Sequence, residues 1–332
     1  MKNIIEKIEL IAQKNSKLLL TIKDSQLTIL YFYMEYGFES RPFTVNIPDG
    51  KYIVKVDTFL KFAKNNDFME LVEKDESLYL QNKNRKMRLA VFVNDILKDF
   101  KFNHKAEFGV TIFSDIRKDI ASLNKFTTII NVNKAYEGVL FDEENMVSVD
   151  IHRVHLVEGK ISTPKPFVVS QACQKVLAKI EPKNFQVSTD DTTILTTDEG
   201  RFFFKNIKNE FPNYMAVYGD RSNQERIDNI STKFDKKELI KELKIMIDIL
   251  KLPKQKVVSC KYEDGVFYGY NDDENYEFKF NLAMNRSFGF NAIYLKQALE
   301  VIDEPLITTT EGVRPVEIFD QNIRHLVMPL RV

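Results

Sequence analysis

The stretch FGFNAIYLKQALEVIDEPLITTTEGVRPVEIFDQNIRHLVMPL, from Phe288 to Leu330, decides the fold because its pattern occurs three times in the chain. It has an extended apolar start, a short helix, and two strands around a turn. A second copy, FVVSQACQKVLAKIEPKNFQVSTDDTTILTTDEGRFFF, begins at Phe167, and a first copy, YIVKVDTFLKFAKNNDFMELVEKDESLYLQNKNRKMRLAVF, begins at Tyr52. These three starts lie 115 and 121 residues apart. The sequence therefore predicts a tandem repeat.

A further helix and a hairpin precede each copy. The helical segments are NIIEKIELIAQKNS, SDIRKDIASLNKF and KKELIKELKIMIDIL, and in the first of them Ile4, Ile8 and Ile11 share one face. Each third is thus helix, strands, helix, strands. Two short helices cannot cover both faces of so many strands, so they must share one face of an antiparallel sheet. We predict an α+β fold with three domains, at residues 1–109, 110–231 and 232–332.

Composition limits the class of protein. The chain has 332 residues, 44% of them hydrophobic and 29% charged, which is typical of a globular protein. No apolar run approaches the roughly 20 residues that a membrane helix needs, and the start MKNIIEKIELIAQKN is unlike a signal peptide. Only Cys173 and Cys260 are present, far apart, which favours a cytoplasmic protein with two buried thiols.

An enzyme is the competing class. The acidic runs Asp142-Glu143-Glu144 and Asp272-Asp273-Glu274 have ligands that suit Mg²⁺, although acidic hairpin loops are the simpler interpretation. His152 and His155 are three residues apart, and on one strand they would point to opposite faces. No HExxH, P-loop or dinucleotide glycine motif occurs. Cys173 lies in an apolar helix and is expected to be a core residue, so we predict no catalytic residue, metal or cofactor.

Four segments, in order, carry a resemblance to a known family. They are VDIHRVHLV (149–157), EFPNYMAVY (210–218), FNAIYLKQAL (290–299) and LVMPLRV (326–332). They resemble the "TDGHRL", "FPDY" and "FN-x-x-Y-L-x-x-x-L" segments and the "VMP-apolar-R-apolar" C-terminus of the bacterial DNA polymerase III β subunit, the DNA sliding clamp. The likeness covers roughly residues 114–332, and residues 1–109 are assigned by the repeat alone.

The resemblance implies three tandem clamp-type domains in a head-to-tail homodimer, a closed ring with helices lining the hole and sheets outside. Such a ring is a non-catalytic processivity factor that encircles duplex DNA without reading its sequence. It tethers a DNA polymerase, a clamp loader and repair proteins through short peptides rich in Gln, Leu and Phe. Ile151 stands where the family has Gly, and Ala216 where many members have Arg. These departures bear on the preferred peptide and are compatible with a clamp encoded by a phage or mobile element.

The same resemblance assigns a peptide-binding groove between the second and third domains. Carried over position by position, its residues are Tyr136, Val149, His152, Arg153, Val154, Pro212, Val217, Asn291, Tyr294, Val313, Pro315, Leu326, Val327, Met328, Pro329, Leu330 and Arg331. Arg153 and Arg331 would be available to peptide carbonyls or to a carboxylate. In the C-terminal segment, Pro329 breaks the strand ladder, so we expect the last residues to leave the sheet.

The distribution of charge agrees with a ring around DNA. The chain has 48 basic and 48 acidic residues, so its total charge gives no support to nucleic-acid binding. The six helices expected to line the hole carry a net charge of +6, and the remainder −6. The predicted DNA-facing cations are Lys7, Lys14, Lys17, Lys61, Lys64, Arg117, Lys118, Lys125, Lys175, Lys179, Lys237, Lys241 and Lys244. Lysine is also a common residue on any solvated helix face.

The same motifs also fit a second interpretation of the function. A clamp-like module that sequesters replication partners would carry the same motifs without closing a ring. The mass in solution separates the two, because a sequestering module has no need to dimerise.

Overall fold

The computed structural model describes most of the chain in two compact units. The described residues are 2–64, 70–74, 77–91, 104–128, 133–218, 234–252, 257–271, 273–282, 284, 287–309 and 315–330. Unit 1 comprises Met1–Ala121 and Ser162–Lys208, and unit 2 comprises Ser122–Ile161 and Asn209–Val332. Each unit therefore consists of two separate segments of the chain.

Unit 1 is built on one antiparallel sheet. Its strand order is β5-β1-β2-β3-β18-β17-β16-β9, with β4 paired to β2. The bounds are β1 Lys17–Lys23, β2 Gln26–Tyr33, β3 Tyr36–Ser40, β4 Phe43–Thr44, β5 Gly50–Lys55, β9 Ala106–Gly109, β16 Asn184–Ser188, β17 Thr192–Thr196 and β18 Gly200–Lys205. Strands β3 and β18 join the two segments of this unit, because Phe38 and Phe202 are partners in register.

A glycine permits this junction. Gly37 lies opposite Phe203 in the register of β3 and β18. A Cβ atom at Gly37 would lie 2.3 Å from the Phe203 ring and 2.3 Å from the Tyr31 carbonyl oxygen. Any larger residue would push the two strands apart at this point.

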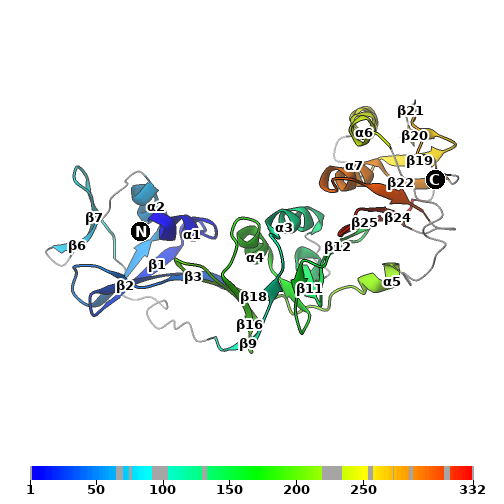
Figure 1. Cartoon of the computed structure of the whole chain (residues 1–332). Helices are drawn as coiled ribbons and strands as arrows, with labels where there is room; N and C mark the ends of the chain where they lie inside the picture. Colours follow the sequence, from blue (N-terminus) through cyan, green and yellow to red (C-terminus); the bar gives the residue numbers. More distant parts are fainter. Residues whose placement is uncertain are drawn as a thin grey trace. The chain divides into compact units, whose positions relative to one another are not determined.

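Helices cover one face of the sheet in unit 1 (Figure 1). They are α1 Lys2–Glu9, α2 Val56–Lys64 and α4 Gln171–Leu177. Each buries one apolar stripe at helical spacing, such as Val56, Phe59 and Ala63 on α2. The unit also contains the sheet β6-β7-β8, with bounds Glu70–Lys74, Ser77–Gln81 and Lys86–Arg88, as well as β10 Thr111–Ile112 and β15 Phe167–Val169. Helix α3 (Arg117–Leu123) and strand β14 (Ile161–Ser162) lie where the chain passes between the units.

Unit 2 contains two antiparallel sheets. One has the order β11-β12-β13-β25-β24-β23, with bounds Val139–Asp142, Asn145–Asp150, Arg153–Glu158, Ile323–Val327, Val316–Phe319 and Leu306–Thr308. The other has the order β21-β20-β19-β22, with bounds Asn275–Lys279, Val266–Tyr270, Ser259–Glu263 and Phe288–Asn291. The helices are α5 Tyr214–Tyr218, α6 Lys236–Leu250 and α7 Ala292–Val301, with 3-10 helices η2 Asn124–Phe126 and η3 Lys134–Glu137.

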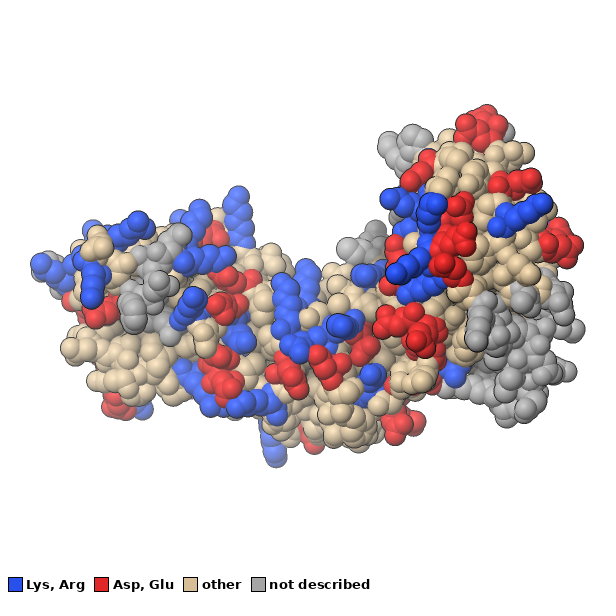
Figure 2. Space-filling model, turned by 45° about the horizontal axis from the view of Figure 1, so that its top comes forward, with Lys and Arg blue, Asp and Glu red and all other residues tan. Residues whose placement is uncertain are grey.

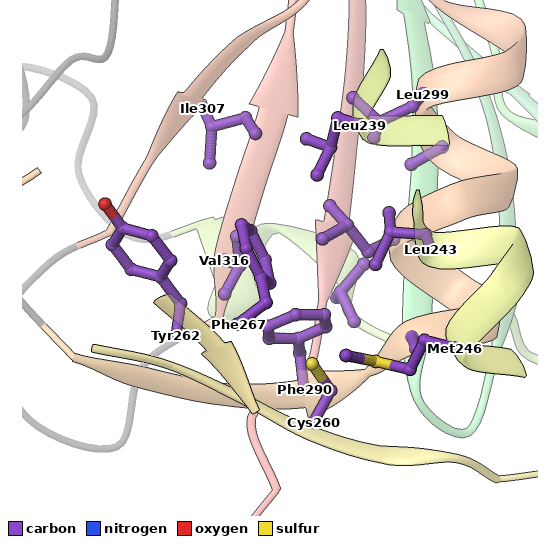
Figure 3. Packing of buried hydrophobic residues seen from close by; sticks show 14 of the residues in the cluster. Leu239, Leu243, Met246, Cys260, Tyr262, Phe267, Phe290, Leu299, Ile307 and Val316 are labelled. Carbon is purple, nitrogen blue, oxygen red and sulfur yellow. The ribbon is translucent and has the colours of Figure 1, made fainter. Parts of the chain in front are cut away.

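The core of unit 2 lies between α6, α7 and the two sheets. Leu239, Leu243 and Met246 of α6 point toward Phe267 and Phe290 of the smaller sheet (Figure 3). Val316 and Ile307 of the larger sheet complete the cluster. Asp235 begins α6, because its side chain accepts a hydrogen bond from the Glu238 N–H at 3.0 Å.

The element order repeats three times, as the sequence predicts. Two helices, each followed by strands, occur as α1 and α2, as α3 and α4, and as α6 and α7. The strands after the second helix of each repeat are β6–β8, β16–β18 and β23–β25. The predicted α+β class with antiparallel sheets is confirmed. The helix α5 in the EFPNYMAVY segment was not foreseen.

The compact units follow the sheets and do not end at the predicted domain limits. Pairing of β3 with β18 crosses the limit at residue 109, and pairing of β13 with β25 crosses the limit at residue 231. The three predicted domains stay a prediction. Among the described residues, no helix is long and apolar enough to cross a membrane.

Candidate functional site

The turn between β12 and β13 is the centre of the candidate site. Asp150 and Arg153 are partners in register, so Ile151 and His152 form a two-residue loop. One oxygen of Asp150, Oδ1, accepts a hydrogen bond from the His152 N–H at 2.8 Å, which fixes the turn. The Ile151 side chain is 63% exposed. His152 thus lies in the turn, and our expectation that it shares a strand with His155 is wrong, because β13 begins only at Arg153.

Arg153 connects this turn to two other elements. Its Nε and Nη2 donate to Asp150 Oδ2 at 2.7 and 2.5 Å, and its Nη1 donates to Gln297 Oε1 of α7 at 2.5 Å. The guanidinium carbon lies 4.0 Å from the ring centroid of Tyr294 and 5.1 Å from that of Phe126. The side chains of Arg153 and Asp150 are only 10% and 8% exposed. This is a buried ion pair with hydrogen bonds and aromatic contacts on several sides.

Helix α7 presents Tyr294 to the turn. Asn291 begins the helix, and its Oδ1 accepts hydrogen bonds from the N–H groups of Ile293 and Val258, both at 3.1 Å. The Tyr294 ring stacks on the His152 ring with centroids 6.1 Å apart. Burial raises the pKa of Tyr294, so its hydroxyl stays protonated at neutral pH.

The C-terminal segment Met328–Leu330 lies against the same turn. Strand β25 ends at Val327, and the next N–H, of Met328, donates to the His152 carbonyl at 2.9 Å. Pro329 has no N–H, and the Leu330 N–H donates to the Gly289 carbonyl at 3.1 Å. Pro329 thus ends the ladder as predicted, and the segment is held by two carbonyls from distant parts of the sequence.

The other predicted groove residues lie in the same unit. The buried ones are Val149, Val154, Asn291, Leu326 and Val327. The half-buried ones are Tyr136 in η3, Pro212 before α5, Val217 on α5, and Pro315 before β24. Val313 and Arg331 lie outside the described residues. The contacts above bring together His152, Arg153, Tyr294 and Met328.

Asp150 and Gln297 are residues that the sequence analysis missed. Asp150 has a local signal, because an Asp three residues before an Arg across a tight turn favours an ion pair. Gln297 has none, because it is 144 residues from its partner.

A buried histidine pair lies beside the site and was also missed. His155 and His325 are cross-strand partners of β13 and β25, with their Nδ1 atoms 3.1 Å apart. Ser122 Oγ lies 2.9 Å from His155 Nε2, and the Phe126 ring contacts both imidazoles. Burial lowers the pKa of His155 to about 3, and burial with the neighbouring His155 lowers that of His325 well below its usual value. Both rings are therefore neutral at physiological pH.

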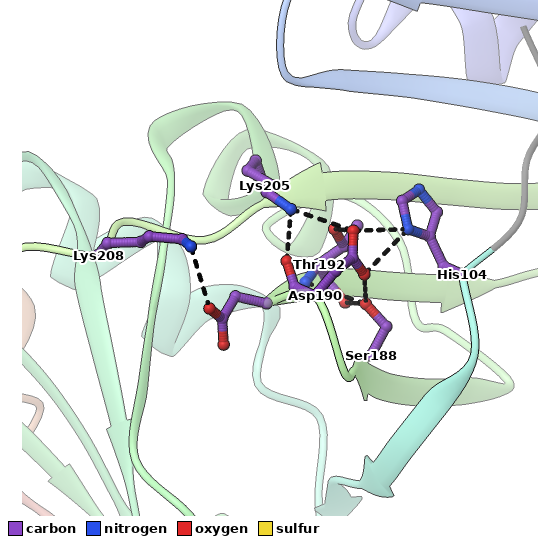
Figure 4. Close-up of polar contacts among 7 residues, drawn as sticks. His104, Ser188, Asp190, Thr192, Lys205 and Lys208 are labelled. Carbon is purple, nitrogen blue, oxygen red and sulfur yellow. Dashed lines mark hydrogen bonds and ion pairs between the residues drawn. The ribbon is translucent and has the colours of Figure 1, made fainter.

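A second polar cluster, in unit 1, has the residue types of a hydrolase (Figure 4). The Asp190 carboxylate lies 3.0 Å from His104 Nδ1 and 3.1 Å from Lys205 Nζ, and it accepts the Ser188 hydroxyl at 2.5 Å. Partial burial raises the pKa of Asp190, but hydrogen bonds from Ser188, Lys205 and His104 outweigh it and lower the pKa below the usual range. The Ser188 hydroxyl donates to this carboxylate, whose lowered pKa makes it a poor base for activating a serine. This cluster fixes the β16–β17 turn.

The remaining candidates for chemistry have structural explanations. Asp142 Oδ2 accepts a hydrogen bond from the Tyr214 hydroxyl at 3.0 Å, and Glu143 has a positive φ of 51° in a hairpin turn. Asp272 lies outside the described residues, among which no group of His, Cys, Asp and Glu is arranged to hold a metal ion. Cys173 and Cys260 are buried, and burial raises the pKa of both thiols.

The predicted DNA-facing cations lie on or beside helices. Those exposed to solvent are Lys14, Lys61, Lys64, Arg117, Lys118, Lys125, Lys175, Lys179, Lys237, Lys241 and Lys244, whereas Lys7 and Lys17 are half-buried. Ion pairs with acidic side chains join Lys7 to Glu199, Lys64 to Glu9, and Arg117 to Asp115. Basic side chains gather over the helix-bearing side of unit 1, with acidic ones between them (Figure 2).

Solved structures with this architecture span the whole chain. A DNA polymerase sliding clamp from Pseudomonas aeruginosa, determined with a ligand, has a TM-score of 0.82 at 16% identity, over 100% of this chain and 97% of that chain. The chain has the fold of a bacterial DNA sliding clamp. The Helicobacter pylori beta clamp bound to a DNA ligase peptide gives 0.77 at 16% identity, over 99% and 97%. The DNA polymerase III beta subunit of Thermotoga maritima gives 0.78 at 17% identity, over 100% and 96%.

Sequence comparison gives no such match. No protein-family model and no curated protein matches this chain. The clamp fold is thus shared at an identity of 16–17%, which explains why only four short segments carry the resemblance in sequence.

Proposed function

We propose that this chain is a DNA sliding clamp, a non-catalytic processivity factor that encircles duplex DNA and tethers a polymerase and other replication or repair proteins. The observation that carries the proposal is the clamp fold over the full length of both chains, with 100% of this chain and 97% of the Pseudomonas clamp covered. A fold alone does not fix a function. The buried Asp150–Arg153 ion pair, which fixes the exposed turn, and two oppositely charged sheet edges add support.

We propose a head-to-tail homodimer, and two oppositely charged sheet edges support it. Strand β8 is an edge of its sheet in unit 1, and the exposed side chains along 83–88 include Lys83, Arg85, Lys86 and Arg88. Strand β21 is an edge in unit 2, and Asp273, Glu274 and Glu277 are exposed along it, against one lysine, Lys279. The basic edge of one copy attracts the acidic edge of a second copy, whereas two basic or two acidic edges repel each other. This charge pattern favours a head-to-tail contact between the copies.

A mostly polar cavity lies beside the acidic edge and includes two exposed apolar side chains, Ile249 and Tyr270. It has a volume of about 610 Å³ and is lined by Ile249, Tyr270, Asn271, Asp273, Glu274, Asn275 and Tyr276. Ile249 and Tyr270 are 43% and 42% exposed. Large exposed apolar side chains next to complementary charges are typical of interfaces.

Charge exchange tests the dimer. One variant replaces Arg85 and Arg88 by Glu, and a second replaces Glu274 and Glu277 by Lys. At micromolar concentration, light scattering should give a monomer of about 39 kDa for each variant and twice the 38.8 kDa chain mass for the unaltered protein. A chain with both reversals should dimerise again. A concentration-independent monomer for the unaltered chain would favour the sequestering module instead.

Retention on DNA tests encirclement. Diluting the protein should separate the dimer into single chains. Concentrating these chains again with nicked circular DNA should allow rings to close around the DNA. Rings should then stay on the circle through gel filtration and leave after one cut linearises it. Equal retention on circular and linear DNA would contradict sliding.

The helix lysines are proposed to attract the phosphate backbone weakly. Reversal of Lys14, Lys118 and Lys241 to Glu should impair retention, and the wild-type affinity should fall with salt. A matched variant with three reversals at exposed lysines outside the helices and both charged edges, at Lys23, Lys51 and Lys105, controls for net charge.

The proposed peptide surface has its own test. Removal of Met328–Val332 takes away the two backbone hydrogen bonds of the C-terminal segment and should abolish binding of a Gln-, Leu- and Phe-containing peptide in calorimetry. The dimer should persist. Unchanged peptide affinity would place the peptide-binding surface elsewhere.

A further inference from the structure

The Arg153 guanidinium is already engaged by the protein. Three of its N–H groups donate to Asp150 and Gln297, and its central carbon lies 4.0 Å from the Tyr294 ring centroid and 5.1 Å from that of Phe126. The whole residue is 9% exposed. A cation that is to receive a carboxylate from a ligand is normally kept accessible and short of partners, and Arg153 is neither.

The partners of Arg153 belong to three separate parts of unit 2. Asp150 ends β12, Phe126 ends η2, and Tyr294 and Gln297 lie one turn apart on α7. Because the guanidinium group is planar and rigid, its hydrogen bonds and ring contacts fix the positions of these partners relative to one another. Lysine carries the same charge but cannot reproduce this geometry.

The same turn controls the C-terminal segment. Asp150 holds the His152 N–H through Oδ1 and Arg153 through Oδ2. The carbonyl of His152 in turn accepts the Met328 N–H at 2.9 Å. The position of Met328 therefore depends on the orientation of one peptide unit that the Asp150–Arg153 pair fixes.

We propose that Arg153 is a positioning residue: with Asp150 it forms a buried clip that holds His152, Tyr294 and Met328 in the arrangement that binds a peptide. The peptide contacts the exposed His152 and the Tyr294 ring, and the guanidinium contacts only protein. This inference rests on the proposed peptide-binding role of the surface. It names the Asp150–Arg153 clip as the element on which the affinity of that surface depends.

The chain offers a matched control in Arg324. It lies on β25, donates to Glu158 of β13 at 2.8 Å and to Glu317 of β24 at 3.0 Å, and stacks on Phe319 at 5.4 Å. Arg324 thus has the same kinds of partner on the same sheet, at the other end of the strand pair. Substitution there changes ion pairing across β13 and β25 without touching the His152 turn.

The first experiment measures affinity. Arg153→Lys, Arg153→Met, Arg324→Lys and Arg324→Met are titrated by fluorescence anisotropy with a labelled hexapeptide containing one Gln, two Leu and one Phe. We expect both Arg153 variants to bind at least tenfold more weakly and both Arg324 variants to stay within twofold of wild type. If Arg153→Met does not fold, the affinities of Arg153→Lys and Arg324→Lys are compared instead.

A second peptide, with one Glu added, separates positioning from direct contact. A positioning residue weakens both peptides by the same factor. A loss confined to the acidic peptide would show that the guanidinium binds the ligand carboxylate, and it would overturn the inference.

A third readout needs no peptide. Protein labelled with 3-fluorotyrosine gives a fluorine resonance for Tyr294, assigned with Tyr294→Phe. We expect Arg153→Lys to shift this resonance and Arg324→Lys to leave it in place, because the Arg153 guanidinium lies over the Tyr294 ring and that of Arg324 lies over Phe319. An unmoved resonance with unchanged affinity would overturn the inference and leave the proposed peptide binding intact. If the wild-type protein binds no peptide, the proposed peptide binding is wrong, and so is the expected effect of Arg153 on affinity. A shifted Tyr294 resonance in Arg153→Lys would still show that Arg153 positions Tyr294.

Discussion

Two carboxylates each hold a turn in this molecule, Asp190 in unit 1 and Asp150 in unit 2, and they differ chiefly in burial. Asp190 accepts hydrogen bonds from Ser188, Lys205 and His104, and its side chain is 44% exposed. Asp150 binds Arg153 and the His152 N–H with a side chain that is 8% exposed. The two sites use similar groups in different surroundings.

This difference in exposure determines how strongly the loss of a polar contact should affect the stability of the fold. Water screens the Asp190 cluster, and its partners lie within or next to a single hairpin. The side chains of Asp150 and Arg153 are largely shielded from solvent, so removing one partner leaves the other charged and buried. We therefore expect the polar groups around β13 and β25 to dominate the response of this protein to mutation and pH.

The largest expected effect is acid destabilisation through His155 and His325. Their folded pKa values lie below the unfolded value near 6.5, so the unfolded chain binds more protons as pH falls, and stability is lost below about pH 6.5. Arg153 on β13 also opposes a positive charge on either ring. For two such histidines the loss between pH 7 and pH 5 is about 4 kcal/mol.

Urea unfolding at both pH values, followed by hydrogen exchange in β13 and β25, measures this loss. The double variant His155→Gln/His325→Gln is the control, and its stability should change much less with pH. An equal loss in wild type and variant would assign the acid effect to other groups.

The next effect is that of Asp150→Asn, which breaks the buried pair. It leaves Arg153 charged without its counter-ion, and we expect a loss of about 3 kcal/mol in the free energy of unfolding. Hydrogen exchange should accelerate at the N–H groups of Met328 and Leu330. Exchange rates as in wild type would show that the turn holds without the carboxylate charge.

A smaller effect is expected for Asp190→Asn, the corresponding change in unit 1. The amide retains part of the hydrogen bonding to Ser188 and Lys205, and water replaces the rest, so the loss should be about 1 kcal/mol. Chemical denaturation of this variant beside Asp150→Asn compares the two sites directly. A loss as large as that of Asp150→Asn would remove burial as the explanation of the difference.

The smallest effect is expected for Lys205→Met. The ammonium pairs with a carboxylate in reach of water, and such pairs contribute about 0.5 kcal/mol. The difference between variant and wild type should disappear in 1 M salt. A difference that persists at high salt would indicate that the hydrogen bond to the Asp190 carbonyl matters more than the charge.

Local patterns were enough to predict the fold class from the sequence. The apolar spacing of α2 and α6 predicts helices that bury one face, and the period-2 strands predict antiparallel hairpins. The resemblance of VDIHRVHLV and LVMPLRV to clamp segments places both stretches at one site. In the structure they are adjacent strands, with Val154 opposite Leu326.

The partners within the site were beyond sequence reasoning. His155 and His325 are 170 residues apart, and nothing in either strand pattern indicates the other. His152 was assigned to a strand because a two-residue loop leaves no glycine or asparagine signal in DIHR. The resemblance implies that Arg153 is available to peptide carbonyls or to a carboxylate, and its sequence gives no sign of the partners on α7 and η2, which reach it only after the strands pair.

The interlaced course of the chain limits how the molecule can be dissected. Unit 1 takes residues from both sides of 122–161, and unit 2 takes residues from both sides of 162–208. A fragment that stops at residue 231 would keep β13 but lose β25, leaving five backbone pairings of β13 without partners. An uncovered edge of that length, with Val154, Leu156 and Val157 on it, is prone to aggregate. Two co-expressed fragments cut within 219–233 should therefore yield soluble protein where either fragment alone does not.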